Sequence, residues 1–424
     1  MLEIGDVRTC ARAARQVLPE LATLSTHLKN AVLLDLADRL EQHTEHILQA
    51  NDADMAEARD AGMEPAMLDR LLLTSDRIAG IAADVRHVAS LPDPIGEEFD
   101  TRLLPNGLEI RRQRVPLGVI GVIYESRPNV TIDVSALCLK SGNAVILRGG
   151  KEARRSNVAL ADLVRAALDA HDAPADAVQI VRDPDRAIVG EMIRMRDEID
   201  LIVPRGGAGL IQFVRENAQI PVVAGGIGVC HTYVHQDADR AKALEIVHNA
   251  KTRRPTICNA LDTVLVHSAI APGFLPALAK RWAEMGVEMR CSPRAIEILR
   301  ESGAPGTWVP ASKDDFGREF LSLRAAVKVV DSLDEAVDHI QTYGSGHSEA
   351  IVTEGYSSSR EFVNRVDAAA VYVNASTQFT DGAQFGLGAE LGISTQKFHA
   401  RGPLGLRELT SYKWVVLGDG QTRP

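Results

Sequence analysis

From residue 115 onward, short apolar segments alternate with segments of helical pattern. In the first half these apolar segments lie at 115–124, 144–147, 177–181, 199–203 and 221–224. Short strands separated by helices are typical of a doubly wound parallel sheet, which binds ligands at the carboxyl ends of its strands. The second half continues in the same style, with apolar segments at 262–266, 287–290, 326–330, 349–352 and 369–373. We therefore predict an α/β protein of more than one domain.

The first hundred residues have the spacing of amphipathic helices. Apolar residues three or four apart run from Leu28 to Leu48. This spacing predicts one long helix that begins after Ser25 and ends at Gly62.

The period changes near residue 100. Asn106-Gly107 lies between two segments of strand pattern, which predicts a hairpin. Arg111, Arg112 and Arg114 alternate with other residues along one arm. A solvent-facing charged hairpin and an arm used in oligomerisation both agree with this pattern.

Charge and composition exclude several partners. The net charge is −10, with 47 basic and 57 acidic residues, which argues against nucleic acid. No apolar run reaches the length of a membrane span, and the first ten residues do not have the pattern of a signal peptide. The five cysteines form no CxxC pair, which indicates free thiols in a reducing compartment. We therefore expect a cytoplasmic protein with no nucleic-acid or membrane partner.

Two strand ends are rich in glycine and basic residues. One is the segment 147–151, which contains Arg148 and Lys151, and the other is 203–209. Glycines let a backbone approach a phosphate, and a helix N-terminus supplies N–H donors. Neither segment has the G-x-G-x-x-G spacing, so ordinary strand-to-helix turns remain an alternative to a phosphate site.

Cys258 is the candidate nucleophile among the five cysteines. Arg253 and Arg254 lie close to it, and the following Pro255-Thr256 suits the start of a helical turn. Positive charge and a helix N-terminus both lower the pKa of a thiol. Cys230, next to His231, is the competing candidate, and an inert buried thiol is the alternative for either cysteine. His231 and His235 lie in a segment of strand pattern without a carboxylate motif, so we predict no metal site.

The order of motifs resembles the aldehyde dehydrogenase superfamily, and within it the family of enzymes that reduce γ-glutamyl phosphate. The resemblance runs almost end to end. The segments that carry it are 119–129, 141–152, 225–231, 254–260, 338–351, 373–382, 385–390 and 399–403. It implies an aldehyde dehydrogenase-like fold, with a Rossmann-type doubly wound cofactor domain, an α/β catalytic domain and a small β oligomerisation element.

The resemblance also implies the cofactor NADPH/NADP and residues that bind it. Arg148 matches the basic residue that closes a strand against the adenosine ribose, and Gly149 adjoins it. Lys151 lies where NAD-preferring relatives often carry an acid, and a cation there suits the 2′-phosphate of NADP. Glu319 matches the residue that holds the nicotinamide ribose. The turn beneath the pyrophosphate comprises Pro204, Arg205, Gly206 and Gly207.

Catalytic and substrate-binding roles follow from the same resemblance. Cys258 matches the nucleophile of the superfamily, and Asn129 lies near its oxyanion-stabilising asparagine. The substrate has anionic ends and an amino-acid head. Arg127, Arg254 and Arg401 are the candidates for the anionic ends, and Asn374 and Ser376 are the candidates for the amino-acid head.

One departure from the superfamily bears on the reaction. Hydrolytic relatives carry a glutamate at the position of Val223, where it activates water. Valine cannot act as a base, and an enzyme whose acyl group comes from phosphate does not need one. We therefore expect NADPH-dependent reduction of L-glutamyl 5-phosphate to L-glutamate 5-semialdehyde and phosphate through a Cys258 thioester, in proline biosynthesis. A CoA-acylating aldehyde dehydrogenase and a non-catalytic protein on the same fold are the alternatives.

The expected domains follow the order of the elements. Residues 1–100 and 115–230 form the NADP-binding domain, 231–375 the catalytic domain, and 101–114 with 400–424 the oligomerisation element, while 376–399 returns to the cofactor domain. A homodimer or homotetramer is expected. Because an acyl phosphate is labile, a separate glutamate 5-kinase is a plausible partner.

Overall fold

The computed structural model describes residues 7–423, which divide into two compact units. Unit 1 comprises the chain up to Ala224, Gly386–Gly392 and the chain from Leu404 onward. Unit 2 comprises Gly225–Phe385 and Ile393–Pro403. The chain thus passes between the units four times.

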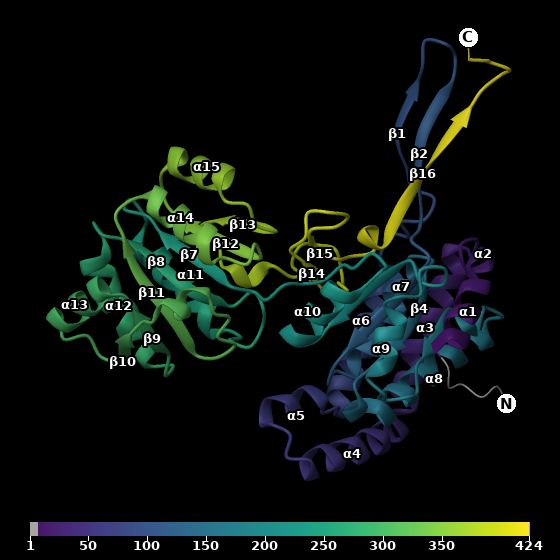
Figure 1. The fold of residues 1–424 in the computed structure, drawn as a ribbon, viewed down its shortest axis with the longest axis horizontal. Coiled ribbons are helices and arrows are strands. Elements are labelled where there is room, and N and C mark those ends of the chain that lie inside the picture. The colour runs from purple at the N-terminus through teal and green to yellow at the C-terminus, as the bar shows by residue number, and fades with distance from the viewer. Residues whose placement is uncertain (1–6, 424) are drawn as a thin grey trace. The chain divides into compact units, whose positions relative to one another are not determined.

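A four-stranded parallel sheet forms the centre of unit 1 (Figure 1). Its order is β5-β4-β3-β6, from β3 (Val119–Tyr124), β4 (Ala144–Arg148), β5 (Val178–Ile180) and β6 (Leu201–Arg205). Every residue of β3 and β4 is buried, as expected for parallel strands covered on both faces. The accompanying helices are α7 (Asn129–Lys140), α8 (Arg154–Ala170), α9 (Ala187–Met192) and α10 (Ala208–Asn217).

Between residue 7 and this sheet, the structure has six helices. They are α1 (Val7–Gln16), α2 (Leu18–Leu21), α3 (Thr26–Gln42), α4 (Thr44–Asp60), α5 (Pro65–Leu71) and α6 (Ser75–Ser90). The single long helix expected up to Gly62 is wrong, because it is interrupted at His43. The hydroxyl of Thr44 donates to the carbonyl oxygens of Leu40 and Glu41 and so competes with the helical hydrogen bonds.

The expected end at Gly62 is confirmed. Gly62 has φ +73°, which favours glycine. Its amide donates to the carbonyl oxygen of Arg59, and the amide of Met63 donates to the carbonyl oxygen of Ala58. This pair of bonds is a Schellman motif.

A seven-stranded, entirely parallel sheet forms unit 2. Its order is β10-β9-β11-β8-β7-β12-β13. The strands are β7 (Cys230–Val234), β8 (Leu261–His267), β9 (Glu288–Cys291), β10 (Thr307–Pro310), β11 (Arg324–Val330), β12 (Ser348–Val352) and β13 (Ala370–Val373). The helices are α11 (Arg240–Thr252), α12 (Ala271–Ala283), α13 (Pro293–Glu301), α14 (Leu333–Tyr343) and α15 (Tyr356–Arg365).

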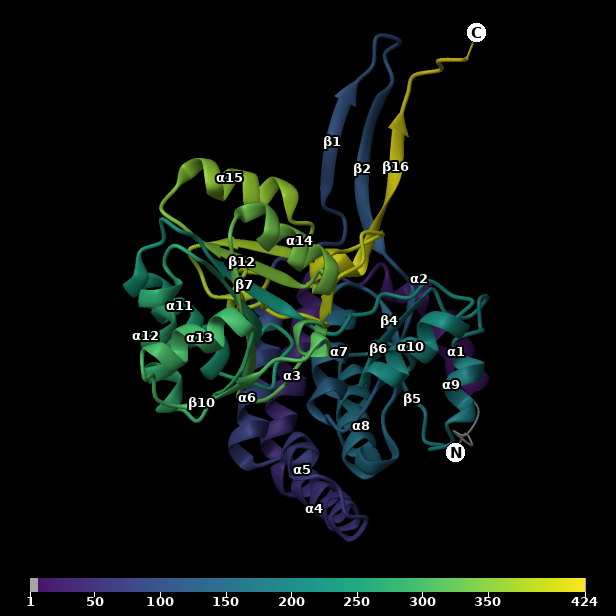
Figure 2. The ribbon, with the colours of Figure 1, turned by 60° about the vertical axis from the view of Figure 1, so that its left-hand side comes forward.

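The predicted hairpin is confirmed as part of a three-stranded antiparallel sheet in unit 1. Strand β1 (Glu98–Leu103) pairs with β2 (Glu109–Pro116), and β2 pairs on its other side with β16 (Thr410–Leu417). Figures 1 and 2 show the three strands side by side. A two-stranded pair, β14 (Ile393–Ser394) with β15 (Gly402–Pro403), belongs to unit 2.

Two further expectations differ from the structure. The segment 221–224 is not a strand, because it forms only a single bridge, between Val222 and Ile202. Of the segment 376–399, expected to return to the cofactor domain, only Gly386–Gly392 packs with unit 1. The β14–β15 pair keeps the segment 393–403 in unit 2.

Candidate active site

Cys258 lies in a loop of unit 2 between α11 and β8. The residues after Pro255 form turns, so the helical turn expected there is wrong. Within these residues the amide of Ala260 donates to the carbonyl oxygen of Ile257 at 3.0 Å, which closes a single turn before β8 begins at Leu261. Arg253 and Arg254, which supply the positive charge expected to favour the thiolate, are both exposed.

The glycine-rich segment 225–229 passes against the backbone of Cys258. A Cβ atom on Gly228 would lie 1.7 Å from the carbonyl oxygen of Cys258, so only glycine fits without a shift of the backbone. The amide of Gly228 donates to Oε1 of Glu319 at 2.9 Å. Glu319, Gly228 and Cys258 therefore form one contiguous group within unit 2.

Burial separates Cys258 from the other cysteines. Cys230 is fully buried, and its Sγ donates to the carbonyl oxygen of Cys258 at 3.3 Å. Burial, reinforced by nearby carboxylates, raises the pKa of the Cys230 thiol well above its usual value. Cys10, Cys138 and Cys291 are also buried, whereas Cys258 is only half-buried. These environments favour Cys258 over Cys230 as the nucleophile.

The segment after β13 holds the Cys258 loop. The Nδ2 atom of Asn259 donates to the carbonyl oxygens of Gln378 and Thr380, at 3.2 and 3.0 Å. Gln378 in turn accepts from Nη1 of Arg253 at 3.2 Å and donates through Nε2 to the carbonyl oxygen of Arg254 at 3.4 Å. These contacts fix the backbone on both sides of the nucleophile.

Arg254 keeps an exposed side chain four residues before Cys258. The other predicted substrate residues of unit 2 are engaged elsewhere. The amide of Asn374 makes two hydrogen bonds to the backbone of Thr353, at 2.9 and 2.8 Å. Ser376 is buried, and its Oγ accepts from the amide of Gln378.

Arg401 is also engaged within unit 2. Its Nη1 lies 2.6 Å from Oδ1 of Asp367, which Lys397 pairs as well. The contacts of Asn374, Ser376 and Arg401 favour structural roles for all three.

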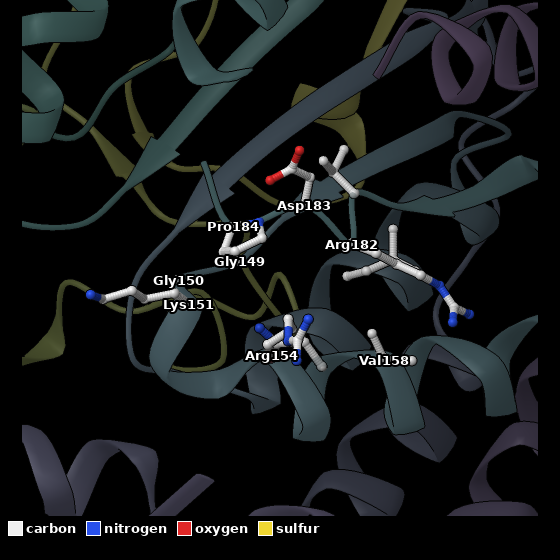
Figure 3. Close-up of a pocket in the computed structure, with 11 residues that line it drawn as sticks. Gly149, Gly150, Lys151, Arg154, Val158, Arg182, Asp183 and Pro184 are labelled. Atoms are coloured by element: carbon white, nitrogen blue, oxygen red, sulfur yellow. The ribbon is translucent and has the colours of Figure 1, made fainter. Parts of the chain in front are cut away.

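A hollow in unit 1 lies between the turn after β4 and the loop after β5 (Figure 3). Figure 3 shows Arg154 and Val158 on one side and Asp183 and Pro184 on the other, with Gly149 between them. Its full lining is Gly149, Gly150, Lys151, Arg154, Asn157, Val158, Ile180, Val181, Arg182, Asp183 and Pro184. Lys151 and Arg154 are exposed at this hollow, so it offers two cations to a phosphate group.

Arg148 is held by the chain itself. Its Nη2 donates to the carbonyl oxygens of Pro184 and Asp185, at 2.7 and 3.1 Å, and Nη1 donates to that of Gly149. Burial lowers the pKa of this guanidinium. Arg148 therefore fixes the loop that forms one side of the hollow.

The predicted pyrophosphate turn has the expected form. Pro204 and Arg205 end β6, and Gly207 is the N-cap of α10. The amide of Gly207 donates to Oε2 of Glu125 at 2.9 Å. A Cβ on Gly206 would lie 2.5 Å from the same carboxylate. The turn thus binds an anionic group of unit 1, the carboxylate of Glu125, and its use for a phosphate stays a prediction.

Arg127 lies in the turn after β3, and Asn129 is the first residue of α7. The Nδ2 atom of Asn129 donates to Oδ2 of Asp133, one turn along the helix, at 2.9 Å. Arg127 is half-buried. Val223, at the position of the absent base, is 3 % exposed.

Sequence analysis did not single out three charged groups, two beside Cys258 in unit 2 and one at the α10 turn of unit 1. Lys251 and Asp262 flank Cys258 in the sequence and are fully buried in unit 2. Their positions on either side of the candidate nucleophile could have marked them in the sequence as residues that act on the site. Glu125 lies inside the motif segment 119–129, but the sequence gives no sign of its contact with Gly207, because the two residues are distant in sequence.

Comparison with known proteins defines the family. The model of the aldehyde dehydrogenase family matches residues 3–295. A γ-glutamyl phosphate reductase from Dehalococcoides mccartyi is 56 % identical over 423 residues, which cover 100 % of this chain and 99 % of the relative. The crystal structure of γ-glutamyl phosphate reductase from Thermotoga maritima matches with a TM-score of 0.95 and 47 % identity, covering 99 % of this chain and 100 % of that one.

A more distant structure shares the fold alone. The acetylating aldehyde dehydrogenase from Geobacillus thermoglucosidasius matches with a TM-score of 0.70 at 18 % identity, covering 99 % of this chain and 97 % of that one. The predicted α/β fold is confirmed, and the family implies a nicotinamide cofactor. The chain belongs to the aldehyde dehydrogenase family and, within it, to the γ-glutamyl phosphate reductases.

Proposed function

We propose that this chain reduces L-glutamyl 5-phosphate to L-glutamate 5-semialdehyde and phosphate, with NADPH as reductant, in proline biosynthesis. The observation that carries the proposal is the 56 % identity to a γ-glutamyl phosphate reductase over the whole chain. The half-buried Cys258 and the hydrocarbon side chain at Val223 support it.

Cys258 performs covalent catalysis in this proposal. Its thiolate attacks the acyl carbon, the carbon–oxygen bond to phosphate breaks, and a thioester forms. When bound, the reduced nicotinamide supplies the hydride for the acyl carbon. Breaking of the carbon–sulfur bond then releases the aldehyde and restores the thiolate of Cys258. Val223 offers no base to activate water, so the thioester is protected from hydrolysis.

A charged group and a neutral amide of the chain are proposed to bind the substrate and the developing oxyanion. Arg254 is the candidate for an anionic end of the substrate, because its guanidinium is exposed while its backbone is fixed. Asn129 is the candidate for the oxyanion. One N–H of its amide is used by Asp133, and the second remains for a developing negative charge.

The residues of unit 1 fit a dinucleotide with a 2′-phosphate. Lys151 and Arg154 place two exposed cations at the hollow after β4, and an extra phosphate adds negative charge there. The α10 turn binds the carboxylate of Glu125, so it has an anion-binding backbone. In unit 2, Glu319 is the candidate for the nicotinamide ribose. These features support NADPH over NADH.

The three-stranded sheet is the proposed homo-oligomer interface, as a dimer or a tetramer. Tyr412, Trp414 and Val416 alternate along β16, so they share one face, and they are 45, 46 and 54 % exposed. The Arg112 guanidinium lies 4.7 Å from the ring centroids of Tyr412 and Trp414. An exposed apolar stripe of this kind marks an association surface.

The proposed cellular setting is the cytoplasm, next to a separate glutamate 5-kinase that supplies the acyl phosphate. Within residues 7–423, no helix has the length and apolar character of a membrane span.

The reverse reaction tests the proposed function. Purified protein is mixed with pyrroline-5-carboxylate, which is in equilibrium with the semialdehyde, and NADP, with and without phosphate. We expect NADPH to form only when phosphate is present. Formation without phosphate would indicate hydrolysis, and formation that requires CoA in place of phosphate would indicate an acylating dehydrogenase. Either outcome would contradict the proposal.

A further inference from the structure

Asp262 interrupts the regular pairing of the two central strands of unit 2. In the parallel pair β7–β8, Cys230 is opposite Leu261 and His231 is opposite Thr263, so Asp262 is an extra residue in β8. A bulge turns a side chain out of the alternating pattern of its strand. This one lies four residues after Cys258, and Asp262 is 1 % exposed.

The bulged carboxylate joins two segments that approach Cys258. Its Oδ1 atom accepts from the amide of Phe320 at 3.0 Å, and Oδ2 accepts from the amide of Cys230 at 3.4 Å. The first bond fixes the residue directly after Glu319. The second fixes the end of the glycine-rich segment that lies against Cys258.

Lys251 balances the buried charge. Its Nζ lies 3.7 Å from Oδ1 of Asp262 and donates to the carbonyl oxygen of Leu261 at 2.8 Å. Burial lowers the pKa of Lys251 and raises that of Asp262, and the charge of each partner opposes these shifts. A buried ion pair is a poor source of net stability, since apolar residues of similar volume often serve as well. The two hydrogen bonds that Asp262 accepts from the amides of Phe320 and Cys230 indicate a role in positioning the backbone rather than in stability.

We propose that Asp262, balanced by Lys251, is a positioning residue for the reaction. It holds Phe320, which places the carboxylate of Glu319 on the amide of Gly228. It also holds Cys230, so that Gly228 stays against the carbonyl of Cys258. The carboxylate that receives the nicotinamide ribose and the loop of the nucleophile are thereby set relative to each other. This inference rests on the proposed function, from which the role of Glu319 is taken.

The test is a double-mutant cycle on dinucleotide binding to the full chain. Asp262→Asn keeps the size of the side chain but replaces one acceptor by an N–H donor that faces a backbone amide. Glu319→Gln removes the charge that Asp262 is inferred to position. We expect each single change to raise the Kd for NADPH, measured by its fluorescence, by roughly tenfold. The double variant should bind about as weakly as either single one, because both changes break the same chain of contacts.

Effects that multiply in the double variant would overturn the inference, because Asp262 would then act independently of Glu319. A Kd unchanged by Asp262→Asn would overturn it as well, while a weakened Glu319→Gln variant would leave the proposed function standing. Wild-type protein that binds no NADPH would instead remove the proposed cofactor and this inference together.

Two further variants guard against misfolding. The pair Lys251→Met with Asp262→Asn removes both buried charges at once, so no uncompensated charge remains. We expect it to fold and still to bind NADPH roughly tenfold more weakly. Asp331→Asn removes an exposed carboxylate of unit 2 that pairs with Arg294, and it should leave NADPH binding unchanged. Wild-type affinity in the charge-free pair would refute the positioning role.

Discussion

The two units prepare for their parts of the reaction in different ways. Around Cys258 in unit 2, buried side chains fix the backbone, as Asn259 and Asp262 do. At the strand ends of unit 1, the cations Lys151 and Arg154 are exposed, and the carboxylate of Glu125 occupies the α10 turn. A fixed geometry suits bond-making at a nucleophile, where small displacements are costly. An exposed, charged surface suits a ligand that must enter and leave in every cycle.

The largest effect is expected at the nucleophile. Cys258→Ala removes the sulfur that forms the thioester, so turnover should fall by at least about 10³-fold. NADPH binding, measured by fluorescence, should be retained. Cys230→Ala is the matched control, because that thiol is buried and its pKa is raised. Turnover that survives Cys258→Ala but not Cys230→Ala would reverse their roles.

The next effect tests how rigid the catalytic loop is. Gly228→Ala places a methyl group where the carbonyl oxygen of Cys258 lies, so the loop must shift. A displacement of this size should lower kcat by about 10²-fold. Gly226→Ala is the control in the same segment, because its nearest neighbour is the hydroxyl of Thr395 at 3.1 Å, which can rotate away. Equal kcat values for the two variants, with thermal unfolding compared alongside, would show that the loop is not rigid.

A smaller effect, on cofactor choice, is expected in unit 1. Lys151→Glu replaces a cation at the hollow by an anion, which repels a 2′-phosphate. The ratio of kcat/KM for NADPH to that for NADH should fall about tenfold or more. Lys280→Glu makes the same charge change on α12 of unit 2 and should leave the ratio as it is. If Lys151→Glu leaves this ratio unchanged, residues other than Lys151 recognise the 2′-phosphate.

The smallest effect is expected at the α10 turn. Glu125 accepts from the amide of Gly207, which the pyrophosphate is proposed to use. Glu125→Gln removes a competing negative charge, so the Kd for NADP should fall about threefold, measured by calorimetry. The gain should shrink at high salt, because it is electrostatic. Weaker binding in this variant would mean that Glu125 supports the turn in the bound state.

The sequence predicts the elements whose signal is local. The buried strands β3 and β4 are continuous apolar runs, and Gly62 ends a helix because its backbone needs a positive φ. The break at His43 was missed because it comes from a hydroxyl–carbonyl contact, which leaves the apolar spacing unchanged. β10 was missed because it is a short edge strand that is partly exposed.

The residues of the site could be predicted where a sequence motif identifies their chemical role. They could not be predicted where their role depends on contacts that form only in the folded chain. Motif resemblance assigned Cys258 and Glu319 to their proposed roles, but it could not show that Gly228 joins them. Resemblance likewise did not reveal that the side chain of Asn374 is hydrogen-bonded to the backbone of Thr353, which lies far from it in the sequence. The bulge at Asp262 depends on strand register, which no local pattern records.

The pairing of β2 with β16 has a consequence for synthesis on the ribosome. Pro116 pairs with Thr410, so one edge of β2 has no partner until the residues up to Thr410 have been translated. At about 5–20 residues per second, this wait lasts roughly 15–60 s. Unit 1 therefore cannot complete its fold as a nascent domain, although its parallel sheet has long emerged. A chain that stalls late in translation would present an open β-edge, a site of aggregation.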